Sequence, residues 1–420
     1  MSTVSDPRPR TATSLVVACI GGLAFVVLAA VLVPWHWLPG HHVEAVSARS
    51  VFTAAQIARD EHVSWMLRLT GWGNLAIGLA VALWLGVTRR GAALVGRLPG
   101  PWWLVTVLGC GAVTLIGTVL EMPLAARAQH VEVDQGLSTQ GWAGWAQDQV
   151  TSFGVDWVFT AIALVVVLAL VRRAPRTWPV WAAGAAAVLA FLGSFVYPVA
   201  VEPLFNHFTP MQAGPLRTEI FQLAEAEHVH VDDVLVADAS RRTTTLNAYV
   251  SGFGSTRRVV VYDTVLKQLD DAEIRSIVAH ELAHAKHDDV LVGTVLGALG
   301  SVFGVGLLGL LLSSGGLLRR AGVSGPGDPR VVPLLLALVA AGSLLASPVE
   351  NTISRAVEAH ADRTALEVTR DPATFVEMQR RLALSSLSDP TPPRISQFWF
   401  GTHPTVLQRI GMAREMYPGE

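Results

Sequence analysis

Long apolar runs constrain this chain more than any other feature of its sequence. Five precede residue 200 and two follow residue 289. They cover residues 14–33, 69–87, 102–120, 157–171, 178–199, 290–312 and 331–346. Most approach the roughly 20 residues that a helix needs to cross a bilayer, and a chain in lipid has to satisfy its backbone polar groups internally. We therefore predict a mainly α-helical, polytopic membrane protein with about seven transmembrane helices.

The composition supports a membrane location. Hydrophobic residues make up 51% of the chain and charged residues only 15%, whereas soluble chains carry roughly 25% charged residues. The net charge of −2 implies no nucleic-acid partner, and we predict the lipid bilayer as a partner instead. Cys19 and Cys110 both lie inside apolar runs, so we expect neither a disulfide nor thiolate–zinc bonds.

The segment His280-Glu281-Leu282-Ala283-His284 carries the clearest chemical signal. It follows acidic residues that can cap a helix. Positions four apart lie on one face of a helix, so both imidazoles can reach one metal ion. Glu281 lies one residue after the first histidine, where it can accept a proton from a metal-bound water. The alternative is a solvated helix that carries these three side chains by chance.

A catalytic zinc usually keeps three protein ligands and one open position. Glu358, on a later predicted helix, is the best third ligand, so we predict one Zn²⁺ per chain bound by His280, His284 and Glu358. Asp362 lies one turn further on and can accept a hydrogen bond from a ligating imidazole. On spacing alone, an exposed acidic helix face is the alternative. We expect His287 and His360 to lie outside the ligand set.

The polar segments around these residues suggest one metallopeptidase domain split by a membrane hairpin. Residues 201–290 contain strand-like runs at 233–237, 245–251 and 258–262 and then the motif helix, so we expect a small β-sheet. The predicted regions are an N-terminal membrane region with five transmembrane helices (1–200), the first part of a zincin-like zinc domain (201–290), a transmembrane hairpin (291–349) and the second part of the zinc domain (350–420).

With these features the chain resembles the type 1 CAAX prenyl endopeptidases, which are integral-membrane zinc metalloproteases with seven transmembrane helices around a large chamber. The resemblance rests on Glu202-Pro203-Leu204-Phe205-Asn206, on Asn247-Ala248-Tyr249 with Gly252-Phe253-Gly254, on the His280–His284 motif with Glu358 and Asp362, and on His403-Pro404 with Arg409. It implies His280, His284 and Glu358 as ligands, Glu281 as base, and Asn247 and His403 as groups that meet the substrate. Because Lys267 and Lys286 are the only lysines, we expect a bacterial member.

Residues 245–251 are well placed as an edge strand to which an extended peptide can add by backbone pairing. We therefore predict substrate binding by Asn247, Ala248, Tyr249 and His403. Asn247 would point into the cleft, although an asparagine there can also be a turn-adjacent polar residue. His403 can donate to the oxyanion of the transition state, and its alternative is a packing role near the C-terminus.

The leading hypothesis is a membrane-embedded zinc endopeptidase that acts on a peptide or membrane-associated protein, with or without an attached lipid. Two alternatives stay open. One is a quality-control or regulatory protease of the heat-shock (HtpX) type. The other is a non-catalytic zinc-bearing scaffold or transporter, against which the presence of Glu281 argues.

The side of the membrane that faces the zinc domain is open, because two arguments conflict. Seven spans put the arginine-rich loops on the face opposite the zinc domain, and the positive-inside rule makes that face cytoplasmic. The family resemblance implies a cytosolic zinc site instead. The arginines concerned are Arg89, Arg90, Arg97, Arg172, Arg173, Arg176, Arg319 and Arg320.

Overall fold

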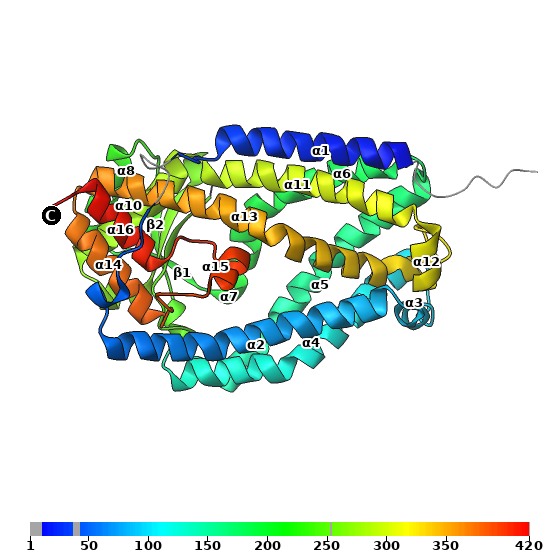
Figure 1. Ribbon diagram of the computed structural model, residues 1–420, viewed down its shortest axis with the longest axis horizontal. Helices are drawn as coiled ribbons and strands as arrows, with labels where there is room; N and C mark the ends of the chain where they lie inside the picture. Colours follow the sequence, from blue (N-terminus) through cyan, green and yellow to red (C-terminus); the bar gives the residue numbers. More distant parts are fainter. Residues whose placement is uncertain (1–10, 37–42, 253, 420) are drawn as a thin grey trace, which may run out of the picture.

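The computed structural model describes residues 11–36, 43–252 and 254–419. In this part of the chain, seven helices are long and apolar enough to cross a membrane. They are α1 (Thr11–Leu32), α2 (Ala54–Gly86), α4 (Trp102–Asp134), α5 (Trp142–Arg173), α6 (Trp178–Val196), α11 (Asp289–Leu312) and α13 (Val332–Thr369, which a 3₁₀ turn at Pro329–Val331 precedes). Figure 1 shows these helices running along the long axis of the molecule. The predicted polytopic, mainly α-helical fold is confirmed.

Several of these helices are longer than the apolar runs that predicted them. α2 begins at Ala54, α4 ends at Asp134, α5 begins at Trp142 and α13 ends at Thr369. Hydropathy detects the lipid-facing part of a helix, whereas the hydrogen-bonded backbone continues into polar surroundings without a break. The fifth run behaves differently, because α6 ends at Val196 and a π-helical turn follows at Tyr197–Val201.

The remaining elements are short and lie mainly in the polar segments. The helices are α3 (Arg89–Val95), α7 (Glu202–Phe205), α8 (Pro215–Ala226), α9 (Asp263–Gln268), α10 (Asp271–Lys286), α12 (Gly315–Ala321), α14 (Pro372–Ser385), α15 (Arg394–Phe400) and α16 (Val406–Met416). The strands are β1 (Phe208–Pro210), β2 (Asp233–Ala237), β3 (Ala248–Ser251) and β4 (Arg258–Tyr262). Phe253, in the predicted turn between β3 and β4, lies outside the described residues.

The described strands form a four-stranded sheet in the order β1-β2-β4-β3. β2 and β4 are parallel, and the two outer pairs are antiparallel. β3 therefore lies at an edge, as predicted, although it begins at Ala248 and not at Thr245. The sheet packs on α10 through a buried apolar cluster that includes Val234, Val259, Val261, Ile274, Val278 and Leu282.

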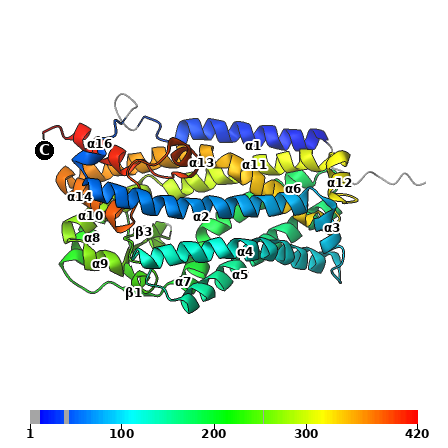
Figure 2. The same ribbon diagram turned by 60° about the horizontal axis from the view of Figure 1, so that its bottom comes forward.

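The sheet and the arginine-rich loops lie at opposite ends of the molecule. Figures 1 and 2 both place the sheet, α8, α10 and α14 at one end, and α3 and α12 at the other. α3 carries Arg89 and Arg90, and α12 carries Arg319 and Arg320.

Two of the predicted domain boundaries fall inside continuous helices. The boundary after residue 290 lies in the first turn of α11, and the boundary after residue 349 lies in the middle of α13. α13 thus runs without a break from its apolar half to the turn that holds Glu358. The helices that cross the membrane therefore also position the polar end.

α1 and α11 pack closely because glycines on α11 let the two backbones approach. A Cβ added to Gly306 would lie 2.6 Å from the Cα of Ala18, whereas a Cβ on Gly304 would meet no atom of the described residues within 4 Å. Small residues at such contacts are typical of helix pairs in membranes.

We expect Gly306→Val to force α1 away from α11 and to lower the free energy of unfolding by about 1–3 kcal/mol, the usual cost of overpacking. Gly304→Val is the matched control, since it makes the same change on the same helix without a clash. Thermal unfolding of both variants in detergent measures the difference. Equal melting temperatures would show that the close approach at Gly306 does not limit stability.

Candidate metal centre and cleft

α10 presents two histidines on the side that faces the cleft. Its first turn forms a capping box, in which the backbone N–H of Glu273 donates to Asp270 at 2.9 Å and the N–H of Asp270 donates to Glu273 at 3.0 Å. Val278 and Leu282 are fully buried. Because the apolar side of α10 is fixed against the core, the positions of His280 and His284 are fixed as well.

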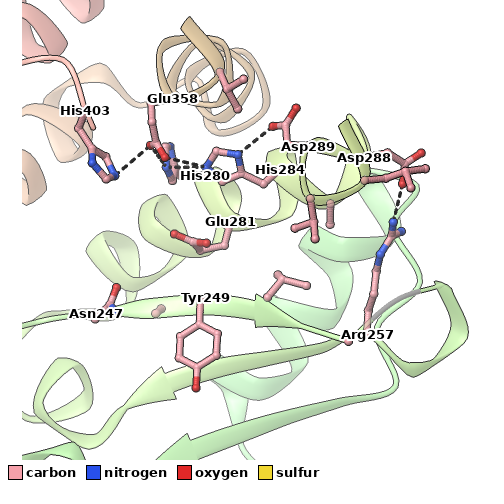
Figure 3. A pocket seen from close by; sticks show the side chains of 17 residues that line it. Asn247, Tyr249, Arg257, His280, Glu281, His284, Asp288, Asp289, Glu358 and His403 are labelled. Atoms are coloured by element: carbon pink, nitrogen blue, oxygen red, sulfur yellow. Dashed lines mark hydrogen bonds and ion pairs between the residues drawn. The ribbon is translucent and has the colours of Figure 1, made fainter. Parts of the chain in front are cut away.

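Figure 3 shows that three donor side chains converge at the cleft. The Nε2 atoms of His280 and His284 are 3.2 Å apart. Glu358, from α13, places Oε2 3.2 Å from His280 Nε2 and Oε1 3.7 Å from His284 Nε2. One ligand atom from each residue can be chosen such that all lie within 4.8 Å of one another.

A carboxylate lies behind each imidazole. Asp362 Oδ1 is 2.9 Å from His280 Nδ1, and Asp289 Oδ2 is 2.8 Å from His284 Nδ1. A carboxylate at such a distance can take the Nδ1 proton of its imidazole, and that tautomer directs the Nε2 lone pair into the space between the histidines and Glu358. Asp362 lies where its spacing from Glu358 predicted it.

Asp289 was missed by the sequence analysis. It is the first residue of α11, and its position at the start of an apolar run suggested only the border of a membrane helix. The available signal was its spacing, because Asp289 follows His284 by five residues across the break between α10 and α11.

These donors fit a metal ion. Two imidazole nitrogens and one carboxylate converge at 3.2 to 3.7 Å from one another, and a cation between them would neutralise the carboxylate and use both nitrogen lone pairs. Ligands arranged tetrahedrally at about 2.0–2.1 Å from zinc are separated by roughly 3.3 Å, which the observed 3.2 Å between the Nε2 atoms matches. Glu358 Oε2 is also buried and accepts no hydrogen bond from the described residues.

Arg409 of α16 holds the carboxylate behind His280. Its Nε donates to Asp362 Oδ2 at 2.7 Å, and its Nη2 donates to Asp362 Oδ1. Asp362 is fully buried, so this two-point contact supplies the opposite charge that a buried carboxylate needs. Arg409, one of the C-terminal residues on which the family resemblance rests, therefore reaches the candidate metal centre.

Glu281 points into the cleft from the same turn of α10 (Figure 3). The cleft has a volume of about 420 Å³, and its lining includes Glu281, the two histidines and Glu358. Burial raises the pKa of the Glu281 carboxyl above its usual value. A general base is most effective when its pKa lies near the working pH, so this shift suits proton transfer.

The predicted substrate-binding residues line the same cleft, though not all in the same way. Asn247, Ala248, Tyr249 and His403 all contribute to its walls. The phenol of Tyr249 points away from the histidines (Figure 3), and its hydroxyl lies 3.2 Å from Glu202 Oε2. Tyr249 can therefore meet a substrate in the cleft through its backbone, while its side chain ties β3 to α7.

The imidazole of His403 lies next to the third donor. Its Nε2 is 3.2 Å from Glu358 Oε2, and its Nδ1 lies 2.8 Å from the hydroxyl of Thr402. Arg355 holds the end of α15 and the start of the loop before His403, through the carbonyl oxygens of Gln397 and Gly401 at 3.1 and 2.6 Å. Because Arg355 and Glu358 are both on α13, the same helix places the loop and the donor.

The other two histidines near the site are not among the converging donors. The rings of His287 and His360 are in contact at a tilt of 40°, with centroids 4.1 Å apart. His287 Nε2 lies 3.0 Å from the hydroxyl of Thr364. They pack α10 against α13, outside the group of converging donors.

Comparison with known proteins gives matches along most of the chain. The model of peptidase family M48 matches residues 210–417, and the model of the CAAX prenyl protease N-terminal region, described as five membrane helices, matches residues 51–207. An uncharacterized metalloprotease of Bacillus subtilis, YhfN, is 32% identical over 315 residues, which are 74% of this chain and 74% of that protein. A CAAX prenyl protease 1 homolog of Oryza sativa subsp. japonica is 26% identical over 315 residues, which are 73% of this chain and 72% of that protein.

A solved structure has the same fold. The crystal structure of S. mikatae Ste24p matches with a TM-score of 0.79 at 18% sequence identity, and the match covers 96% of this chain and 99% of that one. The candidate metal centre lies within the residues that match the peptidase model, and membrane helices α2, α4, α5 and α6 lie within those that match the N-terminal model. The chain belongs to peptidase family M48 and is a multi-pass membrane metalloendopeptidase.

Proposed function

We propose that this metalloendopeptidase uses one Zn²⁺, held by His280, His284 and Glu358, to hydrolyse a peptide that lies along β3. The convergence of three donor atoms beside an unpaired strand edge supports this proposal most directly. Two histidines and one glutamate are also a known donor set of catalytic zinc.

When bound there, zinc would polarise the scissile carbonyl and lower the pKa of a water molecule to about 7. Glu281 takes the proton as the water attacks the carbonyl carbon, and it later returns a proton to the leaving amine. Asp362 and Asp289 keep the two imidazoles in the tautomer that leaves Nε2 free for the metal.

The backbone of β3 offers hydrogen bonds to an extended peptide. Asn247 O accepts the N–H of Tyr262 at 3.0 Å, so odd-numbered residues of the strand pair with β4. By alternation, Ala248 and Val250 direct their backbone groups to the free edge, on which the cleft lies. A peptide that pairs there runs past Glu281 and the metal site.

His403 is proposed to stabilise the oxyanion. If the Thr402 hydroxyl donates to Nδ1, then Nε2 carries the proton and can donate to the developing charge next to the metal. Burial lowers the pKa of His403, although about half of its side chain is exposed. The neutral imidazole, with its proton on Nε2, is the form that would donate to the oxyanion.

The proposed substrates are membrane-associated proteins or peptides, including lipidated ones. Matched relatives are named CAAX prenyl protease 1, and the cleft lies where α11 and α13 leave the membrane region. Substrate trapping with Glu281→Gln, followed by mass spectrometry of bound proteins, identifies them. Trapped proteins without a lipid-modified terminus would favour a quality-control role.

Glu281→Gln should keep zinc but lower kcat by roughly 10²–10⁴, the range that a general base contributes. Glu358→Ala should instead lose zinc, because it removes one of three ligands. Zinc content and peptide turnover of the two purified variants separate the roles. Substantial turnover by Glu281→Gln would refute the base assignment, and full zinc in Glu358→Ala would place the third ligand elsewhere.

His403→Ala should fold and bind zinc normally while kcat falls by roughly 10²–10³, as for the loss of one oxyanion donor. His230→Ala, at an exposed histidine of the polar domain, is the control for the loss of an imidazole. Unchanged kcat in His403→Ala would reduce this residue to a structural role, whereas loss of zinc would make it a ligand.

Asp289→Ala should weaken zinc binding by roughly 10–100-fold, the usual effect of removing a carboxylate behind a ligating histidine. The neighbouring Asp288→Asn is the matched control, since Asp288 pairs with Arg257 at 2.7 Å and not with a histidine. Competition with a chelator measures both affinities. Equal zinc affinities in the two variants would contradict the role given to Asp289.

A further inference from the structure

His403 lies in the short loop between α15 and α16, and few contacts hold its own side chain. Among the described residues, its imidazole meets the Thr402 hydroxyl at 2.8 Å and Glu358 Oε2 at 3.2 Å (Figure 3). About half of the side chain is exposed. A side chain of this kind keeps one place only if the structure beneath it is fixed. The position of the imidazole therefore depends on what holds the backbone of residues 401–405.

The side chain of Gln397 closes this loop. Its Nε2 donates to the carbonyl oxygen of His403 at 2.6 Å. The backbone carbonyl of Gln397 accepts the N–H of Gly401 at 3.1 Å. The glutamine side chain therefore crosses the loop from α15 and fixes the backbone of the residue that carries the imidazole.

Gly401 leaves the space that the Gln397 side chain occupies. A Cβ on Gly401 would lie 2.4 Å from the Cδ and Oε1 atoms of Gln397 and 2.6 Å from its Nε2. The backbone of Gly401 has φ −80° and ψ 103°, which any L residue can adopt. The close passage of the glutamine side chain thus requires the glycine, whereas the turn itself does not.

α13 supports this arrangement from the other side. Arg355 Nη1 donates to the carbonyl oxygens of Gln397 and Gly401, at 3.1 and 2.6 Å. Asn351, one turn earlier and buried, donates to Trp399 O at 2.6 Å. The third metal donor follows Arg355 on the next turn, on the same side of α13. One helix therefore places both the metal donor and the base of Gln397.

We propose that Gln397 is a positioning residue, whose hydrogen bond to the His403 carbonyl determines where the imidazole lies relative to the metal centre. This proposal rests on the proposed role of His403 as a donor to the oxyanion. The residues that line the cleft include His403 and not Gln397, so the glutamine acts on the reaction through the histidine. A donor to the oxyanion has to lie about 2.7–3.1 Å from the oxygen, and a small shift of the loop therefore removes most of its effect.

The test is a double-mutant cycle on the zinc-loaded, full-length protein in detergent, with a peptide that the wild type cleaves. Gln397→Met keeps an unbranched side chain of similar length and removes the amide donor. It should lower kcat by roughly 10- to 100-fold, the scale for displacing a reacting group by about 1 Å. KM and zinc content should stay at wild-type values. Gln222→Met, the same change at an exposed position of α8, is the matched control and should leave kcat unchanged.

The same substitution in a His403→Ala background separates positioning from general structural damage. If Gln397 acts through His403, kcat of the double variant should equal that of His403→Ala within about twofold. The same fold loss in both backgrounds, or wild-type kcat in Gln397→Met, would overturn the proposal and leave the proposed function intact. Wild-type kcat in His403→Ala would instead contradict the proposed role of His403 and this proposal with it.

Gly401→Ala tests the contact from the opposite side. The added methyl group should displace the Gln397 side chain, so kcat should fall as it does in Gln397→Met. Gln397→Ala removes the atoms that this methyl group would meet, so Gly401→Ala should cause no further loss of kcat in a Gln397→Ala background. An independent loss in that background, or wild-type kcat in Gly401→Ala alone, would overturn the proposal.

Discussion

The candidate metal centre depends on two carboxylate–imidazole contacts. Asp362 lies 2.9 Å from His280 Nδ1 and Asp289 lies 2.8 Å from His284 Nδ1, where each carboxylate can take the Nδ1 proton and so direct the Nε2 lone pair to the shared space. Without these contacts, one of two facing imidazoles could donate a proton to the other and the pair would be satisfied without a metal. The carboxylates thus make the convergence with Glu358 a site for a cation.

These carboxylates come from the helices that cross the membrane. Asp289 begins α11, and Glu358 and Asp362 lie in the last third of α13. Only the two histidines belong to α10, which the buried core fixes against the sheet. The polar end and the membrane region therefore cannot be treated as independent units, since a shift of α11 or α13 would move the donors relative to α10.

The sequence predicted the membrane helices, the edge strand and the group of three converging donors, because these depend on local patterns. Apolar runs mark helices in lipid, and the spacing of His280 and His284 puts them on one face of a helix. Glu358 came from its helix pattern and from the family resemblance. The polar extensions of α2, α4, α5 and α13 were not predicted, because hydropathy does not distinguish a polar helix end from a loop.

Two features that link the membrane region to the polar end were not predicted. Asp289 reaches His284 only because the chain turns sharply at Asp288, a residue with a positive φ of 53°. The pairing of residues 137–139 with 242–244 joins segments about a hundred residues apart, and no spacing rule predicts it. Both features depend on how the membrane region packs against the polar end, and local sequence patterns do not report that packing.

X-ray absorption spectroscopy at the zinc edge of the purified full-length protein tests the central claim most directly. The account predicts one zinc per chain, with two imidazole nitrogens at about 2.0–2.1 Å and oxygen ligands from a carboxylate and water at about 2.0–2.2 Å. A spectrum with three or more imidazoles, or with sulfur ligands, would contradict the assignment of Glu358 as the third ligand. Failure to bind zinc stoichiometrically would contradict the metal centre as a whole.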